Sequence, residues 1–214
     1  MSAPVTTESV KELRDATGIS VMQCRRALEE AEGDVKKALA ILKKTSSDIA
    51  LKKVNREVKD GRVAVKTNEK KSVLVSLHCE TDFVARNEDF VSLLDKLVDK
   101  ALSEGTEKTK TEAKEMIDLV IQKTGENIVL GDVVEVSGDV LGYYVHNNKI
   151  GVIVSLERGN PELAKDIAIH VAAMQPEDIP ELLSQSFIKD GEQTVGQLLE
   201  KAQAKIKEVK RCSI

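Results

Sequence analysis

The sequence predicts an α+β protein, in which an N-terminal three-helix bundle is followed by an antiparallel sheet packed with helices. Apolar residues near the N-terminus recur at helical spacing, whereas later runs alternate with the period of strands. Several strand-like runs follow one another directly, which suits hairpins better than the alternating units of a parallel sheet. The chain has 214 residues, of which 41% are apolar and 32% charged, so its composition is globular and its length allows a sizeable core.

Residues 1–45 are expected to form the helical domain. An apolar stripe over 10–16 predicts the first helix. Ser20, with Gln23 three residues later, has the spacing of a capping box and predicts the start of the second helix. Asp34 is expected to cap the third. A bundle of about forty residues is marginal alone, so we expect it to rest on the remaining chain or on a partner.

Residues 46–60 are typical of a polar linker with a helical part, and 61–190 are expected to form the α+β core. Two strands are predicted between 61 and 81, with a turn at the sequence TNEK. A helix capped by Asn87 follows. Another helix is predicted from 108 to 123.

The second part of the core contains three further strand-like runs, at 127–138, 140–148 and 149–157. Asn147 and Asn148 indicate a tight hairpin, because asparagine tolerates positive φ. A helix is predicted from Pro161 to Met174, and Pro176 and Pro180 are expected to break it. Residues 191–214 are expected to be a C-terminal helix, which begins near Thr194, and a tail.

The sequence offers little covalent chemistry. No glycine pattern fits a phosphate-binding loop or a dinucleotide fingerprint, and the cysteines show no metal-ligand spacing. His78 and Cys79 would point to opposite faces of a strand, so they cannot readily act together. We therefore expect no cofactor and no metal. Glu80 and Asp82 are the best paired carboxylates, and a hydrolase that uses them is one alternative.

The net charge of −4 gives no basic field for direct nucleic-acid binding. No apolar run is long enough to span a membrane, and the N-terminus has neither a signal core nor an arginine-rich transit pattern. These features predict a cytoplasmic protein that binds other proteins and makes no membrane contact.

The segment ETDFVARNEDF, residues 80–90, contains two of the three phenylalanines of the chain. Phe90 continues the apolar stripe of the helix that Asn87 begins, so it is expected in the core. Phe83 does not lie on that stripe. It either plugs the junction between strand and helix or stands exposed beside Asp82 as an anchor for a partner.

The same segment is similar to the signature of the elongation factor Ts family, the guanine-nucleotide exchange factors for the GTPase elongation factor Tu. VKELRDATGISVMQCRRALEEAEGDVKKALAIL resembles the N-terminal domain of that family, which is like a ubiquitin-associated domain. DVLGYYVHNNKIGVIV, IAIHVAAMQP and QTVGQLL match further along in the same order. The resemblance covers nearly the whole chain. It implies translation elongation as the process, and nucleotide exchange without covalent chemistry as the activity.

The resemblance also implies which residues meet elongation factor Tu. In the family, the motif at Asp82 and Phe83 intrudes near the magnesium and phosphate site of the GTPase and promotes GDP release. The expected contacts of this motif are Thr81, Asp82, Phe83 and Val84; those of the N-terminal domain are Arg14, Val21, Met22 and Arg25; that of the hairpin is His146. Val21, Gln23 and Arg25 stand where methionine, aspartate and lysine are frequent, so apolar contact and positive charge are kept.

The chain resembles the short form of the family, without the coiled-coil insertion and the second core subdomain of longer members. This likeness implies a homodimer that forms a 2:2 complex, and it leaves open whether Phe83 and His146 of one chain reach the same partner molecule. Cys212, beside two basic residues, either cross-links two copies or is a free thiol on a frayed end. The alternative function is an interaction adaptor of the ubiquitin-associated type, without exchange activity.

Overall fold

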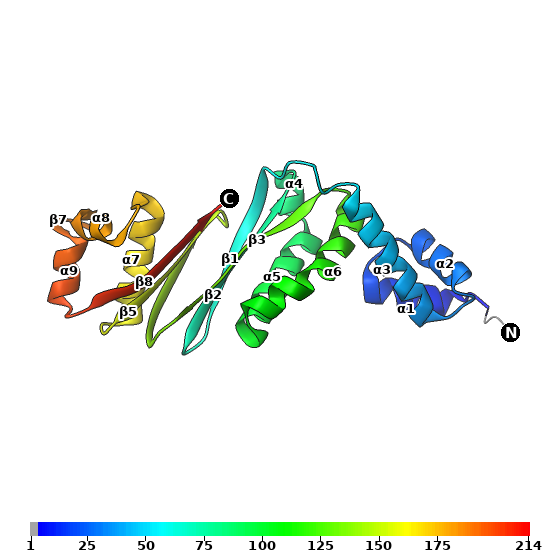
Figure 1. Cartoon of the computed structure of the whole chain (residues 1–214), viewed down its shortest axis with the longest axis horizontal. Coiled ribbons are helices and arrows are strands. Elements are labelled where there is room, and N and C mark those ends of the chain that lie inside the picture. The colour runs from blue at the N-terminus through cyan, green and yellow to red at the C-terminus, as the bar shows by residue number, and fades with distance from the viewer. Residues whose placement is uncertain (1–3) are drawn as a thin grey trace.

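The computed structural model describes residues 4–214, so residues 1–3, at the start of the expected first domain, lie outside the described residues. The prediction of an α+β fold is confirmed. The molecule is elongated, with the N-terminal bundle at one end and the helix α9 (Val195–Lys201) near the other (Figure 1). In the described part of the chain, no helix combines the length and the apolar character needed to cross a bilayer.

The N-terminal bundle consists of α1 (Thr7–Thr17), α2 (Val21–Glu30) and α3 (Val35–Leu51). Cys24 and Leu28 are fully buried in its small core. Asp34 caps α3 as predicted, because its carboxylate accepts hydrogen bonds from two backbone amides of the first turn. Only half of the capping box at Ser20 is present: its hydroxyl accepts from the Gln23 amide and donates to the Gln23 side chain.

The bundle is held against the rest of the chain by α3, which continues into the expected linker and lies along α6 (Thr106–Thr124). Lys43 Nζ lies 2.7 Å from Glu115 Oε2, and the Ser47 hydroxyl donates to Asp118 at 2.6 Å. The expectation that this small bundle leans on the remaining chain therefore agrees with the packing.

The first half of the core, residues 60–137, contains a three-stranded antiparallel sheet and its helices. Its strands are β1 (Asp60–Thr67), β2 (Lys71–Cys79) and β3 (Ile128–Ser137), in the order β1-β2-β3. Its helices are α4 (Asp82–Ala85), α5 (Glu88–Glu104) and α6. Phe90 and Leu97 on α5 are fully buried against Val75 and Leu77 of β2, which fixes the helices on one face of this sheet.

The second half, residues 140–213, has the same plan. Its sheet has the order β4-β5-β8 and consists of β4 (Val140–His146), β5 (Ile150–Glu157) and β8 (Lys205–Ser213). The outer layer consists of α7 (Pro161–Met174), α8 (Ile179–Ser184), α9 and the short strands β6 (Ser186–Phe187) and β7 (Asp190–Thr194). Ile167 and Val171 of α7 pack on Val152 and Val154 of β5.

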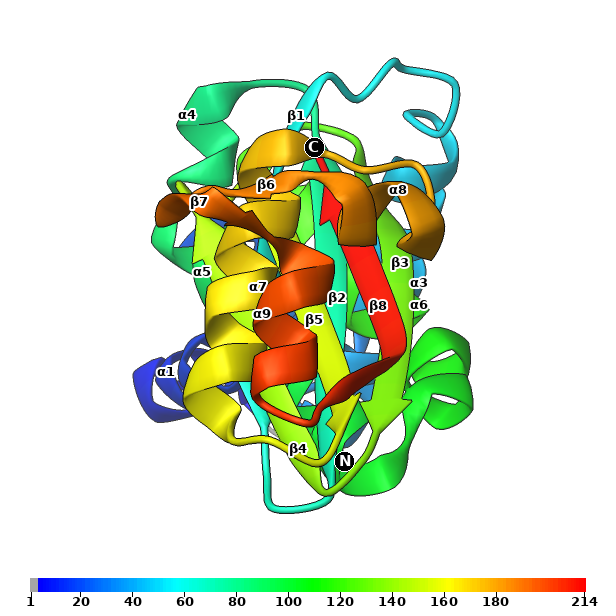
Figure 2. The same ribbon diagram turned by 90° about the vertical axis from the view of Figure 1, so that its left-hand side faces the viewer.

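The two sheets face each other inside one chain (Figures 1 and 2). Val63 and Leu74 of the first sheet form a buried cluster with Ile153 and Cys212 of the second. The order of layers is therefore helices, sheet, sheet, helices. The expectation of a single core without a second subdomain is wrong, because the second group of strand-like runs builds its own sheet and its own helical layer.

The C-terminus also differs from the prediction. The predicted terminal helix ends at Lys201, and β8 continues to Ser213 as an edge strand paired with β5. Lysine residues alternate with Ile206 and Val209 in this stretch. In a strand paired with a neighbour, such alternation places the apolar and the charged side chains on opposite faces. Cys212 is consequently only 6% exposed, so it does not lie on a frayed end. Burial raises the pKa of its thiol to about 11.

Pro180 does not only interrupt a helix. It lies in the first turn of α8, where the missing N–H of proline costs no intrahelical hydrogen bond. Asp178 caps this helix and accepts from the Glu181 amide at 2.8 Å. The chain after α7 therefore starts a new helix where the sequence predicted a break.

Candidate functional site

The turn between β2 and α5 forms α4, a helix of one turn at the end of the first sheet (Figure 2). The Thr81 hydroxyl accepts from the Val84 amide at 3.4 Å and caps α4. Asn87 accepts from the Asp89 amide and caps α5. Two caps in succession separate the short helix from the long one, so Asp82–Ala85 is a distinct projection.

Phe83 is 82% exposed, whereas Phe90 is fully buried seven residues later. Next to Phe83, Ala85 is buried and Val84 packs against the core of the first half. Phe83 gains almost no burial from the fold of its own chain, so the interpretation of this residue as a plug for the junction is wrong. Such a large exposed ring is typical of a contact with a partner.

Asp82 lies beside Phe83 in the first turn of α4. Its carboxylate is 3.0 Å from the Arg86 guanidinium, and the Asp82 side chain is half-exposed. An exposed pair of this kind contributes little to folding stability. The tip of α4 therefore presents an aromatic ring, a carboxylate and a guanidinium together.

Glu80 is occupied by contacts inside the protein. Its Oε1 accepts from the Asn127 amide at 2.6 Å and lies 3.4 Å from Arg56 Nη1. A carboxylate with this internal role leaves the hydrolase alternative without structural support. Within residues 4–214, no group of three or more histidine, cysteine, aspartate or glutamate residues is arranged to hold a metal ion.

The β4–β5 hairpin lies at the same end of the molecule as α4. The Asn148 carbonyl accepts from the Val63 amide of β1 at 2.8 Å, and Lys149 Nζ binds the Asp60 carboxylate at the start of β1. Asp60 is paired across the sheet with Cys79, the last residue of β2, after which the chain enters α4. The start of β1 thus connects the hairpin with the junction that carries Phe83.

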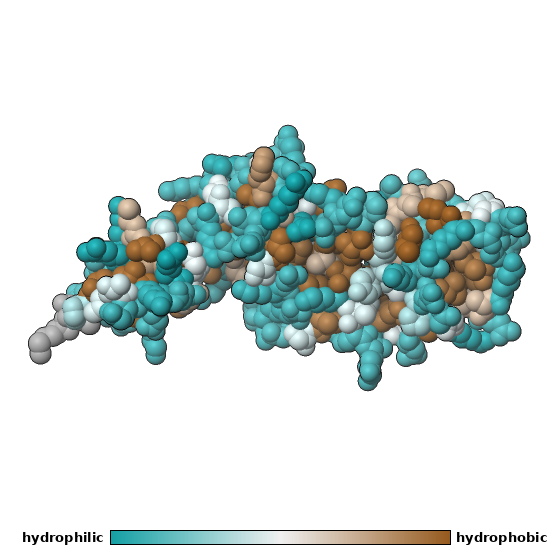
Figure 3. All heavy atoms as spheres, turned by 180° about the vertical axis from the view of Figure 1, so that it is seen from behind, coloured by the Kyte–Doolittle hydropathy of each residue, from teal (hydrophilic) through white to brown (hydrophobic). Residues whose placement is uncertain are grey.

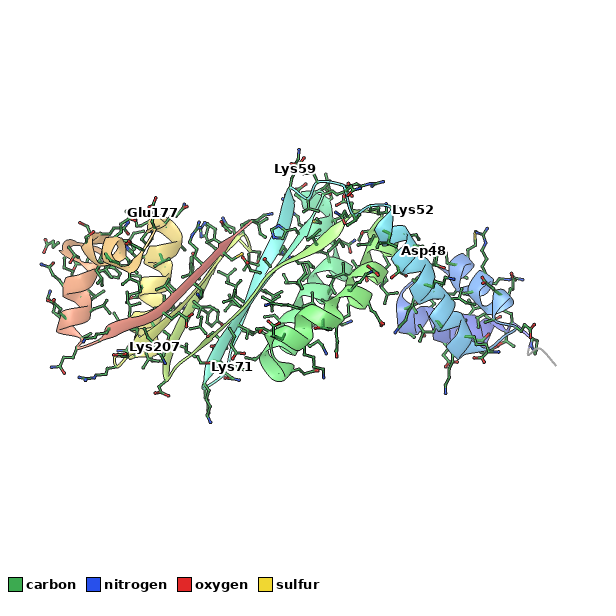
Figure 4. The ribbon with its side chains drawn as sticks, viewed as in Figure 1. Asp48, Lys52, Lys59, Lys71, Glu177 and Lys207 are labelled. Atoms are coloured by element: carbon green, nitrogen blue, oxygen red, sulfur yellow. The ribbon has the colours of Figure 1, made fainter. Side chains whose placement is uncertain are left out.

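Contacts with the hairpin also lower the pKa of the Asp60 carboxyl. Burial alone would raise the pKa of this carboxyl, but the hydrogen bond from Lys149, the Gly61 amide and nearby positive charge outweigh burial and lower it. Figure 4 shows Lys59, next to this site, at one end of the sheets, and Lys71 and Lys207 at the other end.

His146 ends β4 and is exposed at the hairpin. Its Nδ1 is 3.0 Å from the Tyr144 hydroxyl, and its Nε2 is 3.2 Å from the Asn147 side-chain amide. Asn147 and Asn148 have φ of 49° and 58°, so the predicted asparagine hairpin is confirmed. The ring of His146 is therefore held in place at the end of the molecule that also carries Phe83.

The expected contacts of the N-terminal bundle lie on its surface. Val21 and Met22, in the first turn of α2, are 50% and 65% exposed. Arg25 pairs with Glu29 at 2.9 Å, and Arg14 is exposed on α1. On the face in Figure 3, apolar patches are interrupted by hydrophilic side chains, so small contact points fit this surface better than one broad apolar interface.

Sequence reasoning missed two features near the site. Leu51 and Val54, at the end of α3 and in the segment after it, are 64% and 60% exposed. Glu126 binds the backbone at the start of α4 from a loop 45 residues further along the chain. Gly125, which ends α6, could be recognised in the sequence, but the role and the target of Glu126 could not.

About half of the chain matches a known protein family. Residues 80–181 match the family model described as Elongation factor TS. The chain is 44% identical over 182 residues to Elongation factor Ts of Hahella chejuensis, with 82% of this chain and 64% of the relative covered. It is 41% identical over 182 residues to Elongation factor Ts of Pseudomonas fluorescens, with 82% and 62% covered.

Residues 80–181 of the chain therefore resemble an elongation factor Ts domain. The family resemblance inferred from the sequence motifs is confirmed by these matches. The chain spans less than two thirds of the length of these curated relatives, 64% and 62%. The matched region begins at Glu80, so it includes the whole of α4 and the β4–β5 hairpin.

Proposed function

We propose that this protein is a guanine-nucleotide exchange factor for elongation factor Tu in translation elongation. It binds the GDP-bound GTPase, inserts the Asp82–Phe83 tip near the magnesium and phosphate site, and promotes GDP release. The observation that carries the proposal is the exposure of Phe83 on a capped, separate turn of helix. The elongation factor Ts domain at residues 80–181 supports elongation factor Tu as the partner.

The free energies involved require more than one contact. A factor and a nucleotide that weaken each other's binding do so by the same ratio. A thousandfold weakening corresponds to about 4 kcal/mol, and burial of one phenylalanine supplies roughly 1.5–3 kcal/mol. We therefore assign further contacts to Thr81 and Val84, to Arg14, Val21, Met22 and Arg25 of the bundle, and to His146.

Phe83 and His146 of one chain are proposed to reach the same partner molecule. Support comes from the hydrogen bonds that join the hairpin to β1 at the end where β2 leads into α4. The homodimer, its 2:2 complex and a Cys212 cross-link between copies stay predictions. The sheets already cover each other within one chain and the Cys212 thiol is buried, so neither feature of the fold requires a second copy.

Release of a fluorescent GDP from elongation factor Tu tests the proposal. The wild-type protein is expected to accelerate release strongly, and Phe83→Ala to lose most of the acceleration while it stays folded by circular dichroism. Ile188→Ala is a matched control, because Ile188 is an exposed apolar residue of the second half. It should keep full activity.

The outcomes separate the possible functions. A folded Phe83→Ala protein with full exchange activity would contradict the role of the tip. If the wild-type protein itself does not accelerate release, the exchange function is wrong and the adaptor alternative is the one to pursue. Sedimentation of the wild type and of Cys212→Ser, with and without reductant, tests the dimer and its cross-link separately.

A further inference from the structure

Glu126 holds the start of α4 through three hydrogen bonds. Its Oε2 accepts from the backbone amides of Glu80 and Thr81, at 3.1 and 3.0 Å. Its Oε1 accepts from the Thr81 hydroxyl at 2.6 Å. Thr81 is the N-cap of α4, so one carboxylate fixes both the backbone and the side chain of the residue from which the helix starts.

The position of Glu126 is itself fixed by the end of α6. Gly125 ends that helix with φ of 78° and ψ of 2°, a left-handed conformation that glycine adopts without strain. The Lys53 ammonium donates to the Gly125 carbonyl, and the Glu126 amide donates to the Thr124 hydroxyl at 3.4 Å. The loop is therefore held on the N-terminal side of the glutamate.

The contact is reciprocal. While Glu126 accepts from the amide of Glu80, the Glu80 carboxylate accepts from the Asn127 amide at 2.6 Å. The Asn127 side chain in turn donates to the Arg56 carbonyl at 2.9 Å. Residues 80–81 and 126–127 thus close on each other through two carboxylates and three backbone amides, which we call the carboxylate clamp.

Among the described hydrogen bonds, Glu126 is the one residue outside the Thr81–Asn87 turn whose side-chain oxygens bind Thr81. The Thr81 carbonyl also accepts from the thiol of Cys79, the last residue of β2, at 3.2 Å. Phe83 lies two residues beyond Thr81 and has almost no packing contacts of its own, since its side chain is 82% exposed. The direction of the ring therefore depends on how firmly the start of α4 is held.

We propose that Glu126 is a positioning residue for the Asp82–Phe83 tip, which it holds in the orientation needed for insertion into the GTPase. This inference rests on the proposed exchange function. A tip that is already ordered loses less conformational freedom when it inserts, so the clamp raises the rate of nucleotide release. Glu126 acts through Thr81 and α4 and needs no contact with the partner.

The test compares Glu126→Ala, Glu126→Gln and Glu107→Ala in the GDP-release assay. Glutamine can keep the arrangement, because its oxygen can accept from both amides and its NH₂ group can donate to the Thr81 hydroxyl. Glu107 is an exposed glutamate of α6 that pairs with Lys110, so its variant controls for a lost surface charge.

We expect Glu126→Ala to lower the maximal release rate by about tenfold, with little change in the half-saturating concentration of the factor. Glu126→Gln should stay within about twofold of the wild type, as should Glu107→Ala. A Glu126→Ala protein with the wild-type maximal rate would overturn the proposal. Equal losses of release rate in the alanine and glutamine variants would assign the loss to the missing charge and would also overturn the proposal.

A double-mutant cycle with Phe83→Ala distinguishes positioning from an independent contact. If Glu126 acts through the tip, Glu126→Ala should change the residual activity of Phe83→Ala by less than about twofold. Lys149→Met serves as a positive control, because it loosens the hairpin and not the tip. It should lower the residual activity of Phe83→Ala further, which shows that an additional loss can be measured in this background. A full additional loss from Glu126→Ala in this background would reject the positioning role.

Amide hydrogen exchange supplies a readout that does not depend on elongation factor Tu. In the free protein, the amides of residues 81–86 should exchange faster in Glu126→Ala and remain near wild type in Glu126→Gln. Unchanged protection in both variants would overturn the clamp. If the wild type does not accelerate GDP release from elongation factor Tu but the hydrogen-exchange pattern is as expected, the proposed function fails while the clamp is retained.

Discussion

The two halves of the core have the same plan but use opposite ends for their connections. In each half, a hairpin leads through a helical layer to a third strand that pairs with the second strand of the hairpin. The first half leaves β2 through Thr81–Asn87, which contains the extra helix α4. The second half leaves β5 through Arg158, Gly159 and Asn160, and α7 begins at once.

This difference separates scaffold from function. Arg158 and Gly159 have φ of 65° and 92°, so the second junction is a tight turn with no projecting apolar side chain, and Asn160 caps α7. The first junction is longer than a turn from strand to helix requires, and its added helix carries the exposed Phe83. The strand-to-helix topology needs only a short connection like that of the second half. The longer connection of the first half provides the surface proposed to contact the partner.

The corresponding strands of the two halves also run in opposite directions along the two facing sheets: β2 ends at the end of the molecule where β5 begins. The junction of the first half and the hairpin of the second half therefore come to the same end, where Lys149 binds Asp60. Two segments at least sixty residues apart in sequence, 81–86 and 146–149, therefore lie near the start of the same strand, β1.

The largest effect is expected from the two phenylalanines of the first junction. Phe90→Ala should lower the free energy of unfolding by about 3–5 kcal/mol, because Phe90 is fully buried between α5 and the sheet. Phe83→Ala should change it by less than about 0.5 kcal/mol, because the ring is mostly exposed. Urea denaturation of both variants measures the contrast, and similar losses in the two would remove the distinction between scaffold and tip.

A smaller effect is expected at the tie between the halves. Lys149→Met removes the ammonium that binds Asp60, so we expect a loss of stability of about 1 kcal/mol. It should also slow GDP release, because the hairpin with His146 is held less firmly against β1. Lys207→Met, an exposed lysine at the other end of the sheets, is the matched control (Figure 4). The tie has no functional role if the two variants have the same release rate.

The smallest effect is a pH dependence that belongs to the outer layer of the second half. His170 is fully buried; its Nδ1 accepts from the Ile188 amide at 3.2 Å, and its Nε2 is 3.0 Å from Gln185 Oε1. Burial lowers the pKa of His170, although the Gln185 hydrogen bond opposes that shift. The helical layer of the first half is free of histidine, so this pH dependence should be confined to the helical layer of the second half.

The sign of this dependence follows from the lowered pKa. The unfolded chain binds a proton at the ordinary histidine pKa of about 6.5, and the folded chain only at lower pH. The contribution is therefore fully present above about pH 6.5 and is lost as the pH falls toward the folded pKa. Thermal melts of wild type and His170→Gln test this, and the variant should show a shallower slope. His78, whose pKa burial also lowers, titrates in both proteins.

Most elements of the fold could be predicted from local sequence. The helical stripe that includes Phe90, the caps at Asp34 and Asn87 and the hairpin at Asn147–Asn148 all depend on residues within one turn of each other. The C-terminal prediction failed because β8 is a strand only by pairing with β5, a partner about fifty residues away. Lysine-rich alternation does not reveal such a partner.

The site could be predicted in part. The motif around Phe83 pointed to a contact surface, but local sequence left burial and exposure of this ring equally open. Packing decides the question, since α5 takes Phe90 into the core and the extra turn leaves Phe83 outside. The clamp by Glu126 could not be found at all, because hydrogen bonds between residues 80–81 and 126–127 depend on how β2 and β3 pair.

The fold class, the family motifs and most helix ends can be predicted from the sequence, since they depend on side-chain chemistry at short spacing. The packing of two sheets within one chain, the burial of Cys212 and the common end of the tip and the hairpin emerge only in the folded molecule. These features come from contacts between distant segments. Their free energy depends on the burial of shared apolar surface, which no single segment encodes alone.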